Sequence, residues 1–201
     1  MARYTGPRTK VSRRARQLLD DNKARYFDRR PYPPGEHGRR RLRESQYQVQ
    51  LREKQKLRFM YGVLEKQFRR YYREAARHSG ITGTNLLVIL ETRLDNVVYR
   101  AGLARTRPQA RQLVNHGHFL VNGKTVDIPS YQVRVGDVVA VKQGSREILP
   151  IQHSVDTLDR TVPDWLAVDV EPRAITIQDL PAREQIDTDI QEQLVVELYS
   201  K

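Results

Sequence analysis

Apolar residues recur at helical spacing in the first half of the chain. Between residues 45 and 77 they are separated by steps of three or four, which places them on one face of a helix. These residues are Leu57, Tyr61, Leu64, Phe68, Tyr71 and Ala75. Gly62 interrupts the pattern and costs about 1 kcal/mol relative to alanine inside a helix, so a break into two helices is the alternative. A third helix is predicted to begin near Asn85.

The next segment, from residue 93 to 123, predicts two short helices that lead into a hairpin. Leu94, Val97, Val98 and Ala101 lie on one helical face, and Gly102 is suited to the left-handed position that ends a helix. We therefore expect the first of these helices to end at Gly102.

A second helix is predicted to open at Thr106, whose hydroxyl can accept from a backbone N–H at the helix start. Gln109, three residues later, completes a capping-box pattern. The buried side of this helix is expected to consist of Ala110, Leu113 and Val114, with Gly117 as its stop. Asn122-Gly123 then predicts a tight turn after an apolar strand at residues 119–121.

The rest of the chain carries weaker patterns. Residues 126–141 alternate and turn, and further strands are predicted at Leu166–Val170 and Ala174–Ile177, so we expect a small, mostly antiparallel sheet against the two helices. A last helix is predicted within Glu184–Ser200, where four apolar residues have helical spacing: Ile186, Ile190, Leu194 and Leu198. Residues 1–44 show no clear period beyond a short turn near Ser12–Leu19, and we expect a basic arm that a partner orders.

Charge divides the chain into three parts. The formal net charge is +12 over 201 residues, which indicates a polyanionic partner. Residues 1–80 hold 23 Lys and Arg against 8 Asp and Glu, whereas residues 151–201 hold 4 against 11. The first part and the segment 93–124 are therefore expected to face a nucleic acid, and the acidic last part to face away from it or to cover basic protein surface.

The sequence also makes several function classes improbable. It contains no cysteine, so a disulfide framework and a thiolate metal site are excluded. No apolar run approaches the ~20 residues that span a bilayer, and the basic N-terminus lacks the apolar core of a secretory signal. The five histidines have no nucleophile at a telling spacing, and Gly80–Asn85 lacks the lysine of a phosphate loop. We expect a soluble cytoplasmic protein with no catalytic residues, no cofactor, no metal and no membrane partner.

Candidate nucleic-acid-binding residues are mainly cations, because guanidinium groups bind phosphate through two parallel hydrogen bonds. Solvation of a charged helix face is the competing interpretation for each of them. In residues 1–80 the candidates are Arg3, Tyr4, Arg8, Arg13, Arg14, His37, Arg39, Arg40, Arg69, Arg70 and Arg73. In residues 93–124 they are Arg93, Arg100, Arg105, Arg107, Arg111, His116, His118, Asn122 and Lys124.

The segment 93–123 resembles the S-four RNA-binding domain, and the whole chain resembles the family of bacterial small-subunit ribosomal S-four proteins. Five ordered blocks carry the resemblance: RPYPPGEHG (Arg30–Gly38), the helical run Tyr47–Tyr72, the segment 93–123 with its TGTNLLVILE lead-in, IPSYQVRVGD (Ile128–Asp137) and EQLVVELYS (Glu192–Ser200). Many family members bind zinc through N-terminal cysteines. This chain has none, so His37 is interpreted as an RNA contact.

The resemblance implies an α+β fold in which a mostly helical N-terminal domain is completed by the C-terminal helix. The RNA-binding domain, two helices packed on the small sheet, is then an insertion. The expected divisions are a basic arm at 1–44, a helical domain at 45–92 completed by 182–201, and the RNA-binding domain with following strands at 93–181.

The resemblance also implies a structural, noncatalytic protein of the small ribosomal subunit. Its expected partners are small-subunit rRNA, which it binds early in assembly, neighbouring proteins that include the S-five protein, and messenger RNA where it enters the subunit. A role in decoding accuracy is implied as well. Two alternatives remain: an RNA-modifying enzyme that carries the same module, which would need a further catalytic domain, and a regulator that binds its own messenger.

Overall fold

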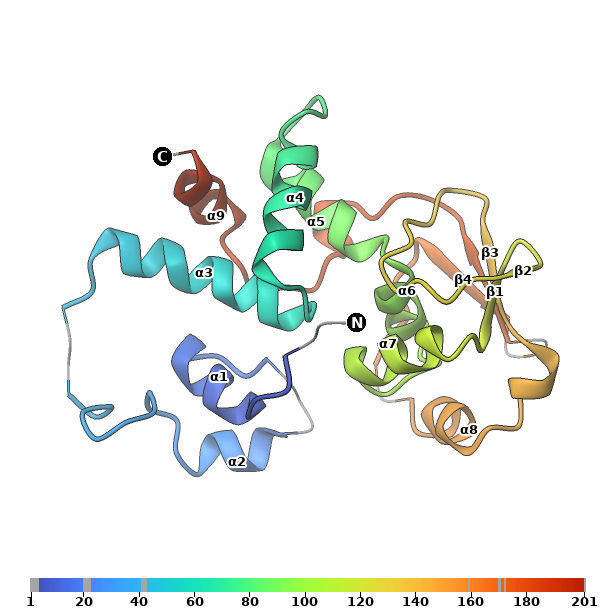
Figure 1. The fold of residues 1–201 in the computed structure, drawn as a ribbon, viewed down its shortest axis with the longest axis horizontal. Helices are drawn as coiled ribbons and strands as arrows, with labels where there is room; N and C mark the ends of the chain where they lie inside the picture. The colour runs from blue at the N-terminus through green and yellow to red at the C-terminus, as the bar shows by residue number, and fades with distance from the viewer. Residues whose placement is uncertain are drawn as a thin grey trace. The chain divides into compact units, whose positions relative to one another are not determined.

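The computed structural model describes residues 4–19, 23–40, 43–158, 160–169, 171 and 173–200 (Figure 1). The chain forms two compact units. The helical unit comprises Met1–Leu86 and Thr188–Lys201, and the α+β unit comprises Leu87–Asp187. The division falls within a helix, and the first unit includes the arm that the sequence pattern separated at residue 44.

The long apolar pattern of residues 45–77 forms two helices, α3 (Gln46–Met60) and α4 (Glu65–Ala75). Ser45 begins α3 with a capping box, because its hydroxyl accepts from the Gln48 N–H and the Gln48 side chain accepts from the Ser45 N–H. The break lies at Gly62, whose φ of 64° is a left-handed conformation. The alternative of two helices is therefore the correct one.

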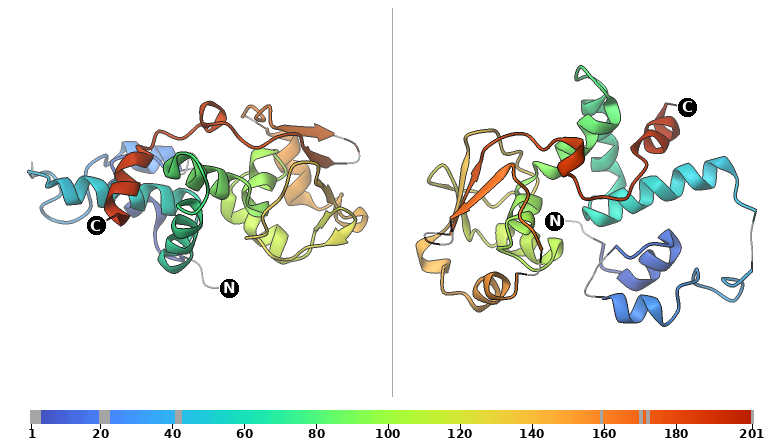
Figure 2. Two further views of the ribbon diagram at one scale, coloured as in Figure 1. Left: turned by 90° about the horizontal axis from the view of Figure 1, so that it is seen from above. Right: turned by 180° about the vertical axis from the view of Figure 1, so that it is seen from behind.

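The C-terminal helix α9 (Glu192–Tyr199) packs beside α3 and α4, as the views in Figures 1 and 2 agree. The Tyr199 ring stacks on Tyr72 at 4.7 Å, and its hydroxyl donates to Glu65 Oε1 at 2.7 Å. Gln50 Nε2 donates to Glu197 Oε2 at 2.8 Å. These contacts attach the C-terminal helix to α3 and α4 and so complete the helical unit, as the family resemblance implied.

The helix predicted within residues 184–200 is shorter than the spacing suggested. Only its last part is helical, and Val195 is its fully buried residue rather than Leu194. Between residues 186 and 190 burial alternates: Ile186, Thr188 and Ile190 are buried, while the two aspartates between them are exposed. A spacing of four also fits a period of two, so Ile186 and Ile190 did not distinguish helix from extended chain.

The N-terminal arm contains two helices that the sequence pattern did not predict, α1 (Arg8–Ala15) and α2 (Ala24–Asp28). Val11 and Ala15 of α1 are buried, and α1 contacts α3. Two apolar residues are too few for a periodic signal in so basic a segment, and packing against α3 stabilises the helix instead.

The α+β unit begins within α5 (Thr82–Glu91), which starts three residues before the predicted position. It continues with α6 (Leu94–Arg100) and α7 (Arg107–Asn115). Thr106 Oγ1 accepts from the Gln109 N–H at 3.2 Å, which confirms the predicted cap. The Gln109 side chain accepts from the Arg105 N–H, one residue earlier than a capping box requires. Gly102 and Gly117 adopt positive φ at the predicted helix ends.

Among the described residues, five strands form one antiparallel sheet in the order β2-β1-β3-β5-β4, which confirms the predicted fold class. Their bounds are β1 Phe119–Val121, β2 Lys124–Thr125, β3 Val138–Val141, β4 Leu166–Asp169 and β5 Ala174–Ile177. Val170, included in the predicted fourth strand, lies outside the described residues. Asn122 and Gly123 form the hairpin turn with φ of 49° and 79°.

The core of this unit lies between the helices and the sheet. Leu94, Val97 and Val98 of α6 are fully buried, together with Phe119 and Val139 from the strands. A helix that the sequence pattern did not predict, α8 (Leu149–Asp156), adds Ile151 to the same core. Two short 3-10 helices, η2 (Gln143–Ser145) and η3 (Arg183–Gln185), complete the described elements.

Candidate nucleic-acid interface

Two candidate RNA-binding arginines lie inside the α+β unit. Arg93 is 1% exposed, and its Nε and Nη2 donate to the Asp95 carboxylate at 3.0 and 2.6 Å. Arg100 donates through Nε and Nη2 to the two oxygens of Glu91, at 3.0 and 2.7 Å. Both guanidinium groups are paired with buried carboxylates, so Arg93 and Arg100 belong to the core of the unit. We therefore leave them out of the proposed RNA-facing surface.

Arg107 is fixed from two sides. Its Nε donates to Asn96 Oδ1 at 2.8 Å, and its guanidinium carbon lies 4.4 Å from the centre of the Tyr99 ring. Asn96 in turn donates to Glu91 Oε2 at 2.6 Å. A chain of hydrogen bonds thus connects a buried carboxylate to a half-buried arginine, which restricts the orientation of Arg107.

Arg160 joins the same cluster, although the sequence pattern did not select it. Its guanidinium carbon lies 3.9 Å from the Tyr99 ring centre, and its side chain donates to the backbone oxygens of Ala104 and Arg105. It stands in the acidic part of the chain, 61 positions after Tyr99, so no local signal could have identified it. The Arg105 side chain is exposed, with Nη1 3.4 Å from Thr157 Oγ1. Arg111 lies 3.9 Å from Asp95.

At the hairpin, Asn122 stabilises the turn. Its Oδ1 accepts from the Val138 N–H at 2.9 Å and its Nδ2 donates to Asp137 Oδ1 at 2.8 Å. These bonds use both ends of the amide, although the Asn122 residue as a whole stays exposed. Lys124, on the other side of the turn, is exposed.

Two histidines follow α7. His116 is exposed, and its ring centre lies 6.0 Å from that of half-buried His118. His118 Nδ1 lies 3.0 Å from Ser145 Oγ. Partial burial lowers the pKa of His118 below its ordinary value, and electrostatic repulsion from His116 and Lys142 lowers it further. These effects favour the neutral form of the His118 imidazole near neutral pH.

In the helical unit, Arg69, Arg70 and Arg73 project from the exposed side of α4. They border a depression of about 870 Å³, together with Lys66 and Glu65. Burial alone would raise the pKa of Glu65, but hydrogen bonds from Lys54 and Tyr199 and the charge of Arg58 lower it overall. Glu65 is already occupied by these partners, so this face is dominated by cations.

The aromatic part of the N-terminal arm is held by arginines. Arg13 Nε donates to the Tyr32 backbone oxygen at 2.9 Å, and the guanidinium carbons of Arg13 and Arg39 lie 5.2 and 4.8 Å from the Tyr32 ring centre. The hydrogen bond from Arg39 lowers the pKa of the Tyr32 hydroxyl. His37 and Arg40 are exposed and Arg8 is half-buried, whereas Arg3 lies outside the described residues.

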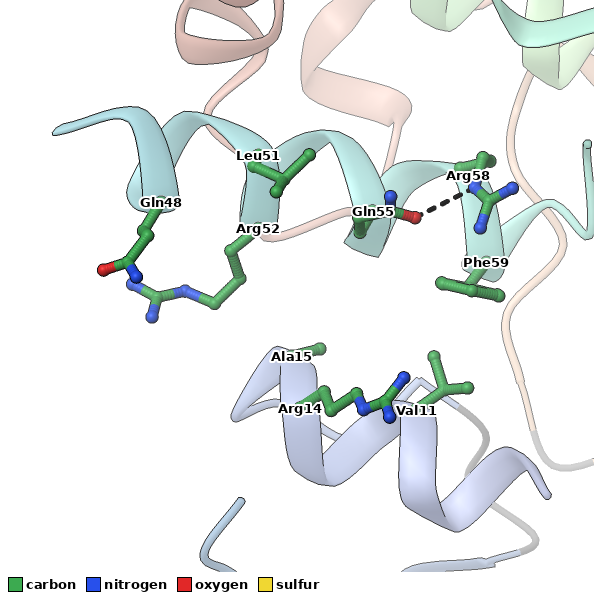
Figure 3. Close-up of a pocket in the computed structure, with 9 residues that line it drawn as sticks. All are labelled: Val11, Arg14, Ala15, Gln48, Leu51, Arg52, Gln55, Arg58 and Phe59. Carbon is green, nitrogen blue, oxygen red and sulfur yellow. Dashed lines mark hydrogen bonds between the residues drawn. The ribbon is translucent and has the colours of Figure 1, made fainter. Parts of the chain in front are cut away.

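A groove runs between α1 and α3 (Figure 3). Its volume is about 340 Å³, and three of its nine lining residues are arginines. The lining residues are Val11, Arg14, Ala15, Gln48, Leu51, Arg52, Gln55, Arg58 and Phe59. The Tyr4 ring meets Phe59 edge to face at 5.1 Å, so this candidate residue lies at one end of the groove.

Within the described parts of the chain, no group of three or more His, Asp and Glu side chains could hold a metal ion. A search of the same residues finds no helix with the length and apolar character to cross a membrane.

Two protein-family models match the chain. Residues 3–91 match the ribosomal protein S4/S9 N-terminal domain, and residues 92–139 match the S4 domain. Proteins named small ribosomal subunit protein uS4 are 62%, 61% and 60% identical in Nocardia farcinica, Rhodococcus erythropolis and Mycolicibacterium smegmatis. Each of these alignments covers 100% of both chains.

Proposed function

Because this chain belongs to the uS4 family of small-subunit ribosomal proteins, we propose that it is a structural protein of the small ribosomal subunit that binds ribosomal RNA directly. The observation that carries this proposal is an identity of about 60% along the entire length of curated uS4 proteins. Its place is the ribosome, and its role is structural rather than catalytic.

The finer parts of the proposal follow from the family resemblance. The protein binds rRNA early and helps to nucleate assembly of the subunit body. It contacts neighbouring small-subunit proteins, with the S-five protein among them, and supports translational accuracy near the path by which messenger RNA enters. The surplus of acidic residues in 151–201 supports contact with basic protein neighbours.

Recognition of the RNA depends mainly on its shape and phosphates, since side chains read the grooves of A-form RNA poorly. The exposed cations support this mode. In the helical unit they include Arg69, Arg70 and Arg73 on α4, and in the α+β unit Arg105 and Lys124; the exposed ring of His116 lies in the same unit. Arg107 and Arg111 contribute from fixed positions at the edge of the core.

The test is binding of the full chain to naked small-subunit rRNA over a range of salt concentrations. Replacing Arg69, Arg70 and Arg73 by glutamine should make the dependence of log K on log salt shallower by about 2–3, because each lost phosphate contact removes roughly 0.7–0.9. The matched control changes three exposed acidic residues to amides: Glu184, Asp187 and Asp189. It should leave the slope unchanged. An unaltered chain that shows no preference for this rRNA over unrelated RNA would contradict the function.

A further inference from the structure

The groove between α1 and α3 has the chemistry of a site for one unstacked nucleotide. Its apolar lining residues come from both helices, Leu51 and Phe59 from α3 and Val11 and Ala15 from α1. In Figure 3, Phe59 and Val11 lie on opposite sides of the gap. Its volume of about 340 Å³ is within the range of small-ligand sites. An apolar slot accepts a planar ring more readily than a hydrated phosphate.

One end of the groove is aromatic. Arg58 places its guanidinium carbon 4.3 Å from the centre of the Phe59 ring, and Gln55 Oε1 accepts from Arg58 Nε at 3.0 Å. The ring of Tyr4, which is 40% exposed, stands edge-on to Phe59. Aromatic rings and guanidinium planes are the groups on which proteins stack bases from single-stranded RNA.

The charge of the groove favours an anion next to that base. None of the lining residues is acidic, and Arg52 is neutralised by Glu44, whose pKa its hydrogen bond lowers. Arg14 is different. Its side chain is exposed and makes no ion pair or hydrogen bond with another described residue. In Figure 3 it lies on the α1 side of the gap, where it can meet the phosphate of a nucleotide whose base enters the slot.

We propose that this groove binds a single unstacked nucleotide of the RNA partner, with its base against Phe59 and Leu51 and its phosphate on Arg14. The inference rests on the proposed function and adds to it a base-contacting site in the helical unit. Such a site provides a contact to one unpaired position of the RNA, in addition to the phosphate contacts of the basic faces.

The test is ultraviolet crosslinking of the full chain to naked small-subunit rRNA, with the crosslinked peptides identified by mass spectrometry. We expect a nucleotide adduct on the peptide that contains Phe59. Leu51→Asp, checked for folding by circular dichroism, should abolish the adduct while RNA binding persists. Arg14→Gln leaves the apolar packing intact and should weaken the adduct roughly fivefold or more, as loss of a nucleotide contact predicts. The matched control is Lys10→Gln, which removes one exposed charge from α1 outside the groove and should preserve the adduct.

Each other outcome overturns the proposal. RNA binding without an adduct on α1 or α3, or an adduct that survives both Leu51→Asp and Arg14→Gln, refutes the groove and leaves the function standing. An adduct formed equally with a nucleoside monophosphate assigns the groove to a soluble nucleotide instead. Failure of the unaltered chain to bind the RNA refutes the function and the groove together.

Discussion

Asn96 Oδ1 accepts a hydrogen bond of 2.8 Å from Arg107 Nε, and through this bond α6 fixes the arginine at the start of α7. The same amide donates 2.6 and 3.0 Å bonds to the carboxylate and the backbone oxygen of Glu91. Glu91 is 1% exposed and Asn96 is 2% exposed, so water cannot replace these bonds. One neutral side chain therefore satisfies a buried carboxylate and a half-buried guanidinium.

Asn96→Ala should destabilise the protein by about 2–3 kcal/mol, because it leaves a buried carboxylate and a guanidinium each short of one partner. Urea denaturation measures the loss. The matched control is Gln112→Ala, an exposed position on α7 that should change the free energy of unfolding by less than about 0.5 kcal/mol. Equal effects of the two substitutions would show that the Asn96 bonds contribute nothing to stability.

Arg100→Met should cost more, about 3–5 kcal/mol, because it leaves the buried Glu91 carboxylate without its paired cation. Arg134→Met, at an exposed arginine, is the control and should be nearly neutral. Chemical denaturation of both variants tests this ranking. A loss below 1 kcal/mol for Arg100→Met would mean that breaking the Glu91–Arg100 ion pair does not substantially lower the free energy of unfolding.

The elements with dense local signals were predictable from sequence. The apolar face of α6, the Thr106 cap of α7 and the Asn122-Gly123 turn each depend on residues within a few positions of one another. The helices α1 and α8 were not predicted, because each is stabilised by one or two buried apolar residues, such as Val11 and Ile151, that meet distant parts of the chain. Local patterning cannot report packing of that kind.

The site was predictable in composition but less so in orientation. Sequence placed Arg93 and Arg100 in the same basic set as Arg105 and Arg107, since all four lie in a short cationic segment. Orientation depends on which carboxylates lie nearby, and Glu91 and Asp95 turn two of these arginines inward. In the same way, Asn122 was selected for its amide but uses it for the hairpin.

The contact between Glu65 and Tyr199 predicts an acid-sensitive attachment of α9. The pKa of Glu65 is lowered from its ordinary value of 4.5, so this group stabilises the folded state above that pH and loses its contribution as pH falls through the lowered pKa. Glu65→Gln should therefore flatten the dependence of melting temperature on pH below 4.5, where the folded and unfolded states differ in proton uptake at this group. Glu74→Gln, at an exposed position of α4, should keep the original slope. A slope unaltered by Glu65→Gln would refute this role.

His118 should titrate below its ordinary pKa of 6.5, because partial burial and the charges of His116 and Lys142 disfavour the imidazolium. A histidine with a lowered folded pKa contributes its full stability above the unfolded value and loses it as pH falls toward the folded one, so mild acid should weaken this region. Histidine ring signals followed by NMR give the midpoint directly. Lys142→Gln removes one of the repelling charges and should raise that midpoint toward 6.5. Lys124→Gln, at an exposed lysine of β2 that does not contribute to the shift, should leave the midpoint in place. If both substitutions moved the midpoint equally, the net charge of the unit rather than the neighbours of His118 would determine its protonation.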